Sequence, residues 1–85
     1  MSRVRVFTAE WCAPCKVLKA ALEAQDDFEY TLIDVDEDAE LVEAAWIRGI
    51  PTVIVCSESE VASELERFVG TKATVINILE VLNGR

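Results

Sequence analysis

Two cysteines separated by two residues carry the most informative chemistry in this chain. They lie in the segment Trp11-Cys12-Ala13-Pro14-Cys15-Lys16, between a run typical of a strand and a run typical of a helix. Side chains three residues apart in the first turn of a helix share one face, within reach of a disulfide bond. The helix N-terminus and a hydrogen bond from the second thiol are expected to lower the pKa of the Cys12 thiol. The spacing therefore predicts a reversible Cys12–Cys15 dithiol/disulfide couple.

Composition limits the classes of function that fit this chain. The 85 residues are 52% hydrophobic, which is typical of one folded domain spanning residues 1–85 and not of a disordered chain. The net charge of −8 argues against nucleic acid or an anionic membrane as a partner. Because no apolar run reaches transmembrane length and the first residues lack a secretory signal, we expect a cytoplasmic protein. In that compartment a lone Cys-x-x-Cys pair is more often catalytic than structural.

The other candidate nucleophiles and ligands favour structural interpretations. Cys56 lies in an apolar run, so we expect a buried, inert thiol. The acidic run from Asp34 to Glu40 lacks the glycine and closing glutamate of a calcium loop and is interpreted as a solvated turn. Three cysteines without a histidine do not make a standard four-ligand zinc site within one chain. We therefore expect neither a metal nor another cofactor.

Hydrophobic periodicity predicts the elements that position the cysteine pair. In chain order they are a strand at Val4–Phe7, a helix at 12–24, a strand at Phe28–Val35, a helix capped by Asp38 and ended by Gly49, a continuously apolar strand at Thr52–Cys56, a strand within Ser57–Val69, and, after the breaker Gly70, a helix at Thr71–Asn83. The expected buried faces are Val17, Leu18, Ala21 and Leu22 in the first helix, Leu41, Val42, Ala45 and Trp46 in the second, and Val75, Ile78, Leu79 and Leu82 in the third.

The segment Ser57–Val69 fits two interpretations. A capping-box pattern from Ser57 to Glu60 allows a helix. Leu65 and Val69 on one side, with glutamates on the other, allow an edge strand. We choose the strand because the apolar run before this segment needs a neighbour in the sheet.

The connections between elements indicate the fold class. We expect strands joined through helices to be parallel, with right-handed crossovers, and the final hairpin to add an antiparallel strand. The sequence therefore predicts an α/β fold in the order β-α-β-α-β-β-α, in which three helices flank a four-stranded mixed sheet.

Three blocks of the sequence resemble the thioredoxin superfamily in its small, glutaredoxin-sized form. They are Phe7–Lys16 with Trp-Cys-x-Pro-Cys-Lys, Ile47–Thr52 with Ile-Pro-Thr, and the Val69-Gly70 pair before the last helix. The resemblance implies a minimal thioredoxin fold and a thiol-disulfide oxidoreductase that reduces protein disulfides, with Cys12 as nucleophile and Cys15 as resolving thiol. It also implies protein substrates that contain disulfides, an upstream reductase similar to thioredoxin reductase, and a monomer.

The resemblance further implies a substrate surface around the cysteines. Trp11 is expected at its rim. The main chain of Ile50 is expected to pair with the substrate as an added strand, next to a cis Ile50–Pro51 bond. The expected substrate-binding set is Trp11, Ala13, Pro14, Ile50, Pro51 and Gly70. Gly70 is interpreted either as a simple breaker or as a site of close approach.

The sequence departs from the family at two supporting positions. The buried aspartate that thioredoxins carry six residues before the first cysteine is Val6 here, and the lysine that usually neighbours it is Leu32. The proton-relay support of the redox pair is therefore missing, which affects rate and pH dependence rather than reaction type.

The sequence is also compatible with two other functions. A glutathione-dependent glutaredoxin fits the short chain, although Cys-Ala-Pro-Cys and Gly-Ile-Pro differ from the Cys-Pro-Tyr-Cys and Thr-Val-Pro typical of that family. A non-catalytic adaptor with the same fold would not need both cysteines.

Overall fold

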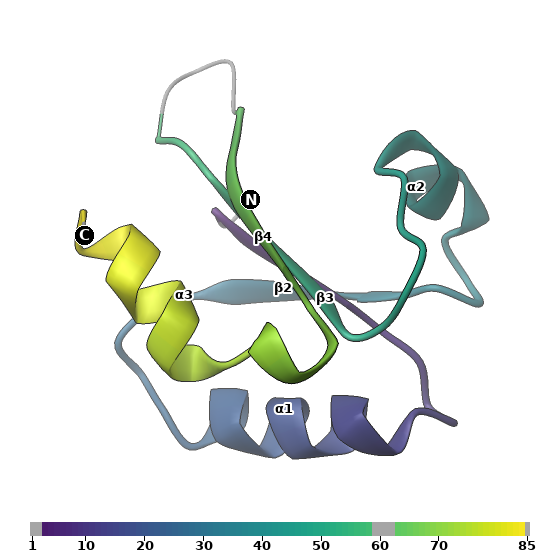
Figure 1. Ribbon diagram of the computed structural model, residues 1–85. Helices are drawn as coiled ribbons and strands as arrows, with labels where there is room; N and C mark the ends of the chain where they lie inside the picture. The colour runs from purple at the N-terminus through teal and green to yellow at the C-terminus, as the bar shows by residue number, and fades with distance from the viewer. Residues whose placement is uncertain (1–2, 59–62, 85) are drawn as a thin grey trace.

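The sheet and helices occur in the predicted order. The computed structural model describes residues 3–58 and 63–84. Its elements are β1 (Val4–Thr8), α1 (Ala13–Glu23), β2 (Tyr30–Asp34), α2 (Ala39–Ala44), β3 (Thr52–Cys56), β4 (Glu64–Val69), a 3₁₀ turn at Gly70–Lys72, and α3 (Val75–Leu82). The strands form one mixed sheet in the order β2-β1-β3-β4. Helices α1 and α3 lie on one side of this sheet and α2 on the other (Figure 1).

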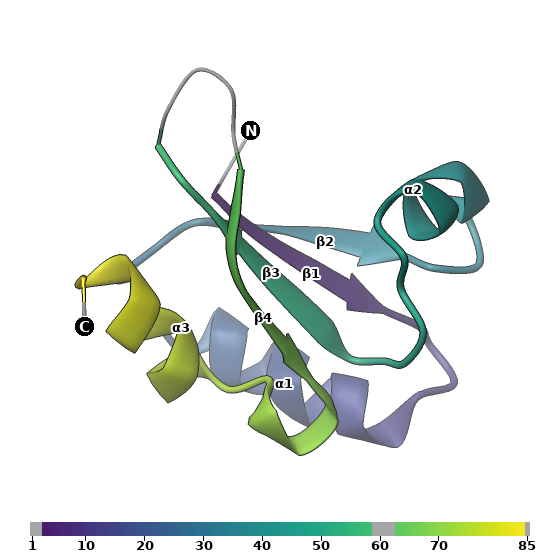
Figure 2. The same cartoon turned by 45° about the horizontal axis from the view of Figure 1, so that its top comes forward.

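The direction of β3 differs from the prediction. β1 and β2 are parallel, as expected for strands joined through α1, but β3 runs antiparallel to β1. Helix α2 has only six residues and is about 9 Å long. It stays near the end of the sheet where β1 and β2 finish (Figure 2). The chain therefore re-enters the sheet from the end at which it left, and β3 runs in the opposite direction.

Helix α2 is shorter than the pattern predicts. It ends at Ala44 and not at Gly49, and two residues later Trp46 has a left-handed φ of 57°. A side chain on Cβ makes this conformation unfavourable, and it stops the helical path. Trp46 and Leu41, both expected in the core, are 70% and 50% exposed. The segment packs against the sheet through Val42 and Ala45.

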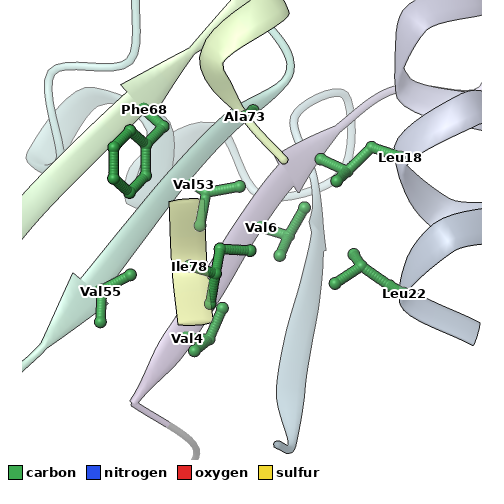
Figure 3. Close-up of a cluster of buried hydrophobic side chains, with 9 residues drawn as sticks. All are labelled: Val4, Val6, Leu18, Leu22, Val53, Val55, Phe68, Ala73 and Ile78. Carbon is green, nitrogen blue, oxygen red and sulfur yellow. The ribbon is translucent and has the colours of Figure 1, made fainter. Parts of the chain in front are cut away.

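The main hydrophobic core lies between the sheet and helices α1 and α3 (Figure 3). It consists of nine buried side chains: Val4, Val6, Leu18, Leu22, Val53, Val55, Phe68, Ala73 and Ile78. Removing such apolar surface from water, at about 25 cal/mol per Å², is the main stabilising contribution in a domain of this size. The predicted inward positions Leu18, Leu22 and Ile78 are confirmed, whereas Val17 and Ala21 are exposed.

Strand β4 confirms the strand interpretation of its segment but reverses the expected face. It pairs antiparallel with β3 at the edge of the sheet. Phe68 pairs with Val53, whose side chain faces α1 and α3, so Phe68 also points into the core and is 7% exposed. Leu65 and Val69 point the other way and are exposed. The alternative capping box ends at Glu60, which lies outside the described residues.

The final helix begins later than predicted. Gly70 has a φ of 64° and starts the 3₁₀ turn. A Cβ built on it would meet no atom within 4 Å, so the glycine serves the backbone conformation and not a close approach. α3 then begins after Thr74, whose hydroxyl accepts the N–H of Asn77 at 3.2 Å. Among the described helices, none has the length and apolar character needed to cross a membrane.

Strand β2 also begins later than predicted, at Tyr30 and not at Phe28. The side-chain amide of Gln25 donates to the carbonyls of Leu22 and Phe28, at 3.2 and 3.1 Å. Its oxygen accepts the N–H groups of Asp27 and Phe28, at 2.9 and 3.2 Å. The side chain of Gln25 therefore bonds both the N–H and the carbonyl of Phe28, and sheet pairing starts two residues later.

The two faces of β4 give a direct test of this arrangement. Phe68→Ala is expected to lower the free energy of unfolding by about 3–5 kcal/mol, because it leaves a cavity in the core. Leu65→Ala, on the exposed face, is expected to cost less than about 1 kcal/mol. Urea denaturation of both variants measures the difference. Equal losses would show that the buried face of β4 is assigned wrongly.

Candidate active site

The cysteine pair lies where three segments leave the sheet at the same end. Phe7 of β1 pairs with Thr52 of β3, and Thr52 pairs with Val69 of β4. The two cysteines follow β1, Ile50–Pro51 precedes β3, and Gly70 follows β4. One row of strand pairing therefore brings together segments that are far apart in the sequence (Figure 2).

The local geometry of the cysteines follows from the start of α1. Cys12 is the N-cap residue, Cys15 lies in the first turn, and Pro14 occupies a position where an amide hydrogen is not needed. The two cysteines form a disulfide with Cα atoms 5.2 Å apart, inside the usual range of roughly 4.4–6.8 Å. The Cys12 sulfur accepts the N–H of Cys15 at 3.3 Å. In the reduced form, this N–H and the helix N-terminus would stabilise negative charge on Cys12.

The two sulfur-bearing residues differ in accessibility. Cys12 is 6% exposed, whereas Cys15 is fully buried, as its place one turn into the helix predicts. Both belong to a small buried cluster with Ala9, against which Val35 and Ile50 pack. An incoming molecule can therefore reach the Cys12 side of the pair and not Cys15.

Four of the predicted substrate-binding residues line one groove. It has a volume of about 520 Å³, is mostly apolar, and lies between α1 and the segment that leads into α3. Ala13, Pro14, Pro51 and Gly70 contribute to its lining. The N–H of Gly70 donates to the Pro51 carbonyl at 2.9 Å, which joins the end of β4 to the start of β3. The predicted cis bond between Ile50 and Pro51 is confirmed.

Ile50 combines a packed side chain with an unoccupied main chain. Its neighbours are engaged: the Gly49 carbonyl accepts the Thr52 hydroxyl, and the Pro51 carbonyl accepts the N–H of Gly70. The main-chain groups of Ile50 have no hydrogen-bond partner among the described residues. A partly exposed residue of this kind, next to a strand, can pair with an extended peptide.

Trp11 lies outside this groove. The residue is 69% exposed, and its indole N–H donates to the Asp36 carboxylate at 2.8 Å. Together with Glu10, Asp34 and Glu37, these two residues line a separate cavity of about 490 Å³. The acidic run after β2 is therefore solvated, as predicted, but one of its carboxylates orients the tryptophan. No pattern in the sequence marks this role, because the contact spans 25 positions.

Arg67 is a second residue that the sequence analysis missed. From β4, its guanidinium donates to the carbonyls of Ala45 and Trp46, at 2.8 and 3.2 Å, and pairs with Glu64 at 2.8 Å. The last carbonyls of a helix have no partner within the helix, so Arg67 anchors the end of α2 and the chain that leads to Ile50. The hydrogen bond from Arg67 lowers the pKa of the Glu64 carboxyl, against a smaller opposing effect of burial.

The two positions that carry the proton-relay pair in the family have no titratable group here. Val6 is fully buried and belongs to the main core. It pairs with Leu32 across β1 and β2. The positions matched to the family's aspartate and lysine are therefore neighbours in the sheet. Val6 is therefore in apolar surroundings, whereas Leu32 is 45% exposed and lines a groove beside α2.

Two further observations concern Cys56 and the side chains that could hold a metal ion. Cys56 is buried in β3 and is the free cysteine of the described chain. Within residues 3–58 and 63–84, no group of three or more His, Cys, Asp or Glu side chains is arranged to hold a metal ion.

Comparison with known proteins identifies the family. Residues 3–80 match the family model described as Thioredoxin. Thioredoxin of Mycoplasmoides gallisepticum is 39% identical over 67 residues, which cover 74% of this chain and 67% of the relative. Thioredoxin of Bacillus subtilis is 37% identical over 71 residues, covering 78% of this chain and 65% of the relative. The structure of Trichomonas vaginalis thioredoxin superposes with a TM-score of 0.77 at 29% identity, covering 94% of this chain and 75% of that one.

This chain belongs to the thioredoxin family. The family and the paired cysteines together indicate a thiol-disulfide oxidoreductase. The chain spans about half to two thirds of the length of several curated relatives, from 42% of a Streptomyces coelicolor protein to 67% of the Mycoplasmoides protein. The roles of the individual substrate-binding residues stay predictions.

The Glu64–Arg67 pair predicts a pH dependence of stability. Because the folded-state pKa of Glu64 lies below its ordinary value of 4.5, the pair stabilises the fold above that pH. The contribution is lost as the pH falls through the lowered pKa. Glu64 is half exposed, so Glu64→Gln should cost less than about 1 kcal/mol at pH 7 and nothing near pH 2. Urea denaturation at both pH values, with Glu43→Gln as control, measures this. A cost that does not change with pH would contradict the assignment.

Proposed function

We propose that this protein reduces disulfide bonds in other proteins through the Cys12–Cys15 couple. The observation that carries the proposal is the unequal burial of the pair at the N-terminus of α1. An accessible sulfur with local stabilisation of negative charge is suited to attack a disulfide. A buried sulfur next to it is suited to react only with its partner.

The reaction balances as two thiol-disulfide exchanges. In the reduced protein, the Cys12 thiolate attacks one sulfur of the substrate disulfide. The substrate S–S bond breaks, a mixed disulfide forms, and the departing substrate sulfur leaves as a thiolate that takes a proton. The Cys15 thiolate then attacks the Cys12 sulfur, the mixed disulfide breaks, and the second substrate sulfur leaves. Two electrons pass to the substrate, and the protein is left with the Cys12–Cys15 disulfide.

Substrate positioning is assigned to the surface around Cys12. An extended peptide pairs with the unoccupied main chain of Ile50, which places a substrate sulfur near the cysteines. Apolar side chains of the substrate enter the groove lined by Ala13, Pro14, Pro51 and Gly70. Trp11, held by Asp36, contacts the substrate from the rim.

Proton transfer in this protein relies on solvent and on the leaving thiolate. Val6 and Leu32 offer no group that could accept the proton of Cys15. The second exchange therefore depends on deprotonation of a buried thiol without a neighbouring base, which is expected to be its slow step at neutral pH.

A complete cycle needs a source of two electrons. We assign this to an upstream disulfide reductase similar to thioredoxin reductase, which returns the Cys12–Cys15 disulfide to the dithiol. We place the protein in the cytoplasm, where thiols are kept reduced. Residues 1–85 are proposed to act as a single domain and as a monomer, because every proposed site residue comes from one chain.

Removal of the nucleophile tests the activity. Cys12→Ser is expected to abolish the acceleration of insulin reduction by dithiothreitol, because the substituted oxygen cannot form the mixed disulfide. Cys56→Ala is the matched control, and it should retain activity because its thiol is buried apart from the site. Turbidity of the insulin B chain measures the rate. Full activity of Cys12→Ser would overturn the proposal.

Removal of the second thiol tests the division of roles. Cys15→Ser leaves the first exchange intact and blocks the second, so a covalent complex with a disulfide-containing protein should accumulate. Mass spectrometry under non-reducing conditions would detect the complex, and tryptic mapping would place the link at Cys12. A complex formed equally by Cys12→Ser would show that Cys15 is accessible and that the roles are reversed.

A further inference from the structure

A second groove lies on the face of the sheet opposite α1 and α3. It has a volume of about 600 Å³ and runs along the side of α2. The short helix covers only part of this face, so Phe7, Ile33 and Ile54 line the groove. Exposed Leu41 and Trp46 also contribute to its walls. Neither cysteine and none of the predicted substrate-binding residues lines this groove.

Arg5 places a positive charge in this apolar groove. It lies in β1 between Val4 and Val6, whose side chains face the main core, so alternation turns Arg5 toward α2. Its Nε is buried and has no hydrogen-bond partner among the described residues. Withdrawing a polar N–H from water without a partner costs free energy, and more so for a charged group. A ligand in the groove would meet the terminal nitrogens of this guanidinium and not the buried Nε. These nitrogens have no hydrogen-bond or ion-pair partner among the described residues either, and a negatively charged acceptor suits them best.

The other arginines of the described chain are all engaged. Arg3 donates to the Cys56 carbonyl and pairs with Glu58, Arg67 pairs with Glu64, and Arg48 lies over the Trp46 ring at 5.6 Å. Two carboxylates line the groove, but Glu64 is engaged by Arg67, and Asp38 forms no ion pair among the described residues. The chain carries 16 acidic residues, so an arginine without a carboxylate is unusual here.

We propose that this groove binds a small amphiphilic carboxylate, with an apolar body and one anionic head, of the size of a medium-chain aliphatic acid. The carboxylate accepts hydrogen bonds from the Arg5 guanidinium. The apolar body lies over the exposed sheet between Phe7 and Ile54 and ends against Trp46. The volume is within the range of roughly 300–1,000 Å³ typical of small-molecule sites.

The position of Trp46 supports this occupant. Its backbone has a left-handed φ, which a bulky residue adopts only where the surroundings impose it, and Arg67 holds its carbonyl. Arg48 stacks on the ring. The tryptophan is therefore held in place at the wall of the groove although it is largely exposed. The net charge of −8 repels anions in general, so selectivity for this anion depends on the local charge of Arg5.

Binding of decanoate tests the proposal on the intact protein. Titration followed by amide NMR is expected to show saturable binding, with shifts concentrated in β1, in β3 and around Trp46. Arg5→Gln should weaken decanoate binding at least tenfold, whereas the matched control Arg3→Gln should change it less than twofold. Decanol, which has the same chain without the charge, should bind at least tenfold more weakly than decanoate.

A second variant keeps the test decisive if Arg5→Gln does not fold. Leu41→Glu adds a negative charge at an exposed position of the groove wall and should also weaken decanoate binding at least tenfold. The proposal is overturned if decanoate does not saturate, if decanol binds equally well, or if a folded Arg5→Gln binds decanoate as tightly as the parent. If Arg5→Gln does not fold, unchanged binding by Leu41→Glu overturns it. It is also overturned if sedimentation shows a dimer that decanoate does not dissociate and amide NMR places Trp46 in its interface. The redox activity is independent of these outcomes.

Discussion

The functional end of this molecule depends on one row of main-chain pairing across β1, β3 and β4. Phe7, Thr52 and Val69 stand side by side in that row, and the three segments of the site begin where it ends. Because Phe7 and Thr52 are buried, the row belongs to the rigid part of the sheet and not to its loops. A shift of one residue would turn each strand over and separate Pro51 from Gly70. The position of the cysteine pair is therefore set by the sheet.

The sequence predicts the elements where the information is local. The apolar run of β3, the two cysteines and the inward residues Leu18 and Leu22 follow from composition and spacing alone. The direction of β3 does not, because it depends on where α2 ends. Helix α2 ends at Ala44, two residues before a left-handed tryptophan that no pattern marks. The buried face of β4 is also ambiguous from the sequence. Only the pairing of Phe68 with Val53 decides between the two sides.

The site shows the same division between local and distant information. Cys12, Pro14 and Cys15 lie within four positions, so their spacing indicates their chemistry. The contacts that hold the surrounding loops cross long stretches of chain, from Trp11 to Asp36 and from Arg67 to the end of α2. Such polar contacts leave no periodic signal. The sequence also gives no sign that the main-chain groups of Ile50 lack a hydrogen-bond partner among the described residues. This depends on the neighbouring Gly49 and Pro51 carbonyls, which bond to other groups.

The full burial of Cys15 has a consequence for oxidative damage. Peroxides oxidise an accessible thiolate to sulfenic acid and, with further exposure, to sulfinic and sulfonic acids that are not readily reversed. In this protein an oxidant meets Cys12, while Cys15 stays shielded with its Cα 5.2 Å away. A sulfenic acid on Cys12 would condense with the neighbouring thiol, lose water and give the same Cys12–Cys15 disulfide that closes the catalytic cycle. Chemical damage at the more accessible sulfur is thereby converted into an ordinary oxidised form that a reductant can restore.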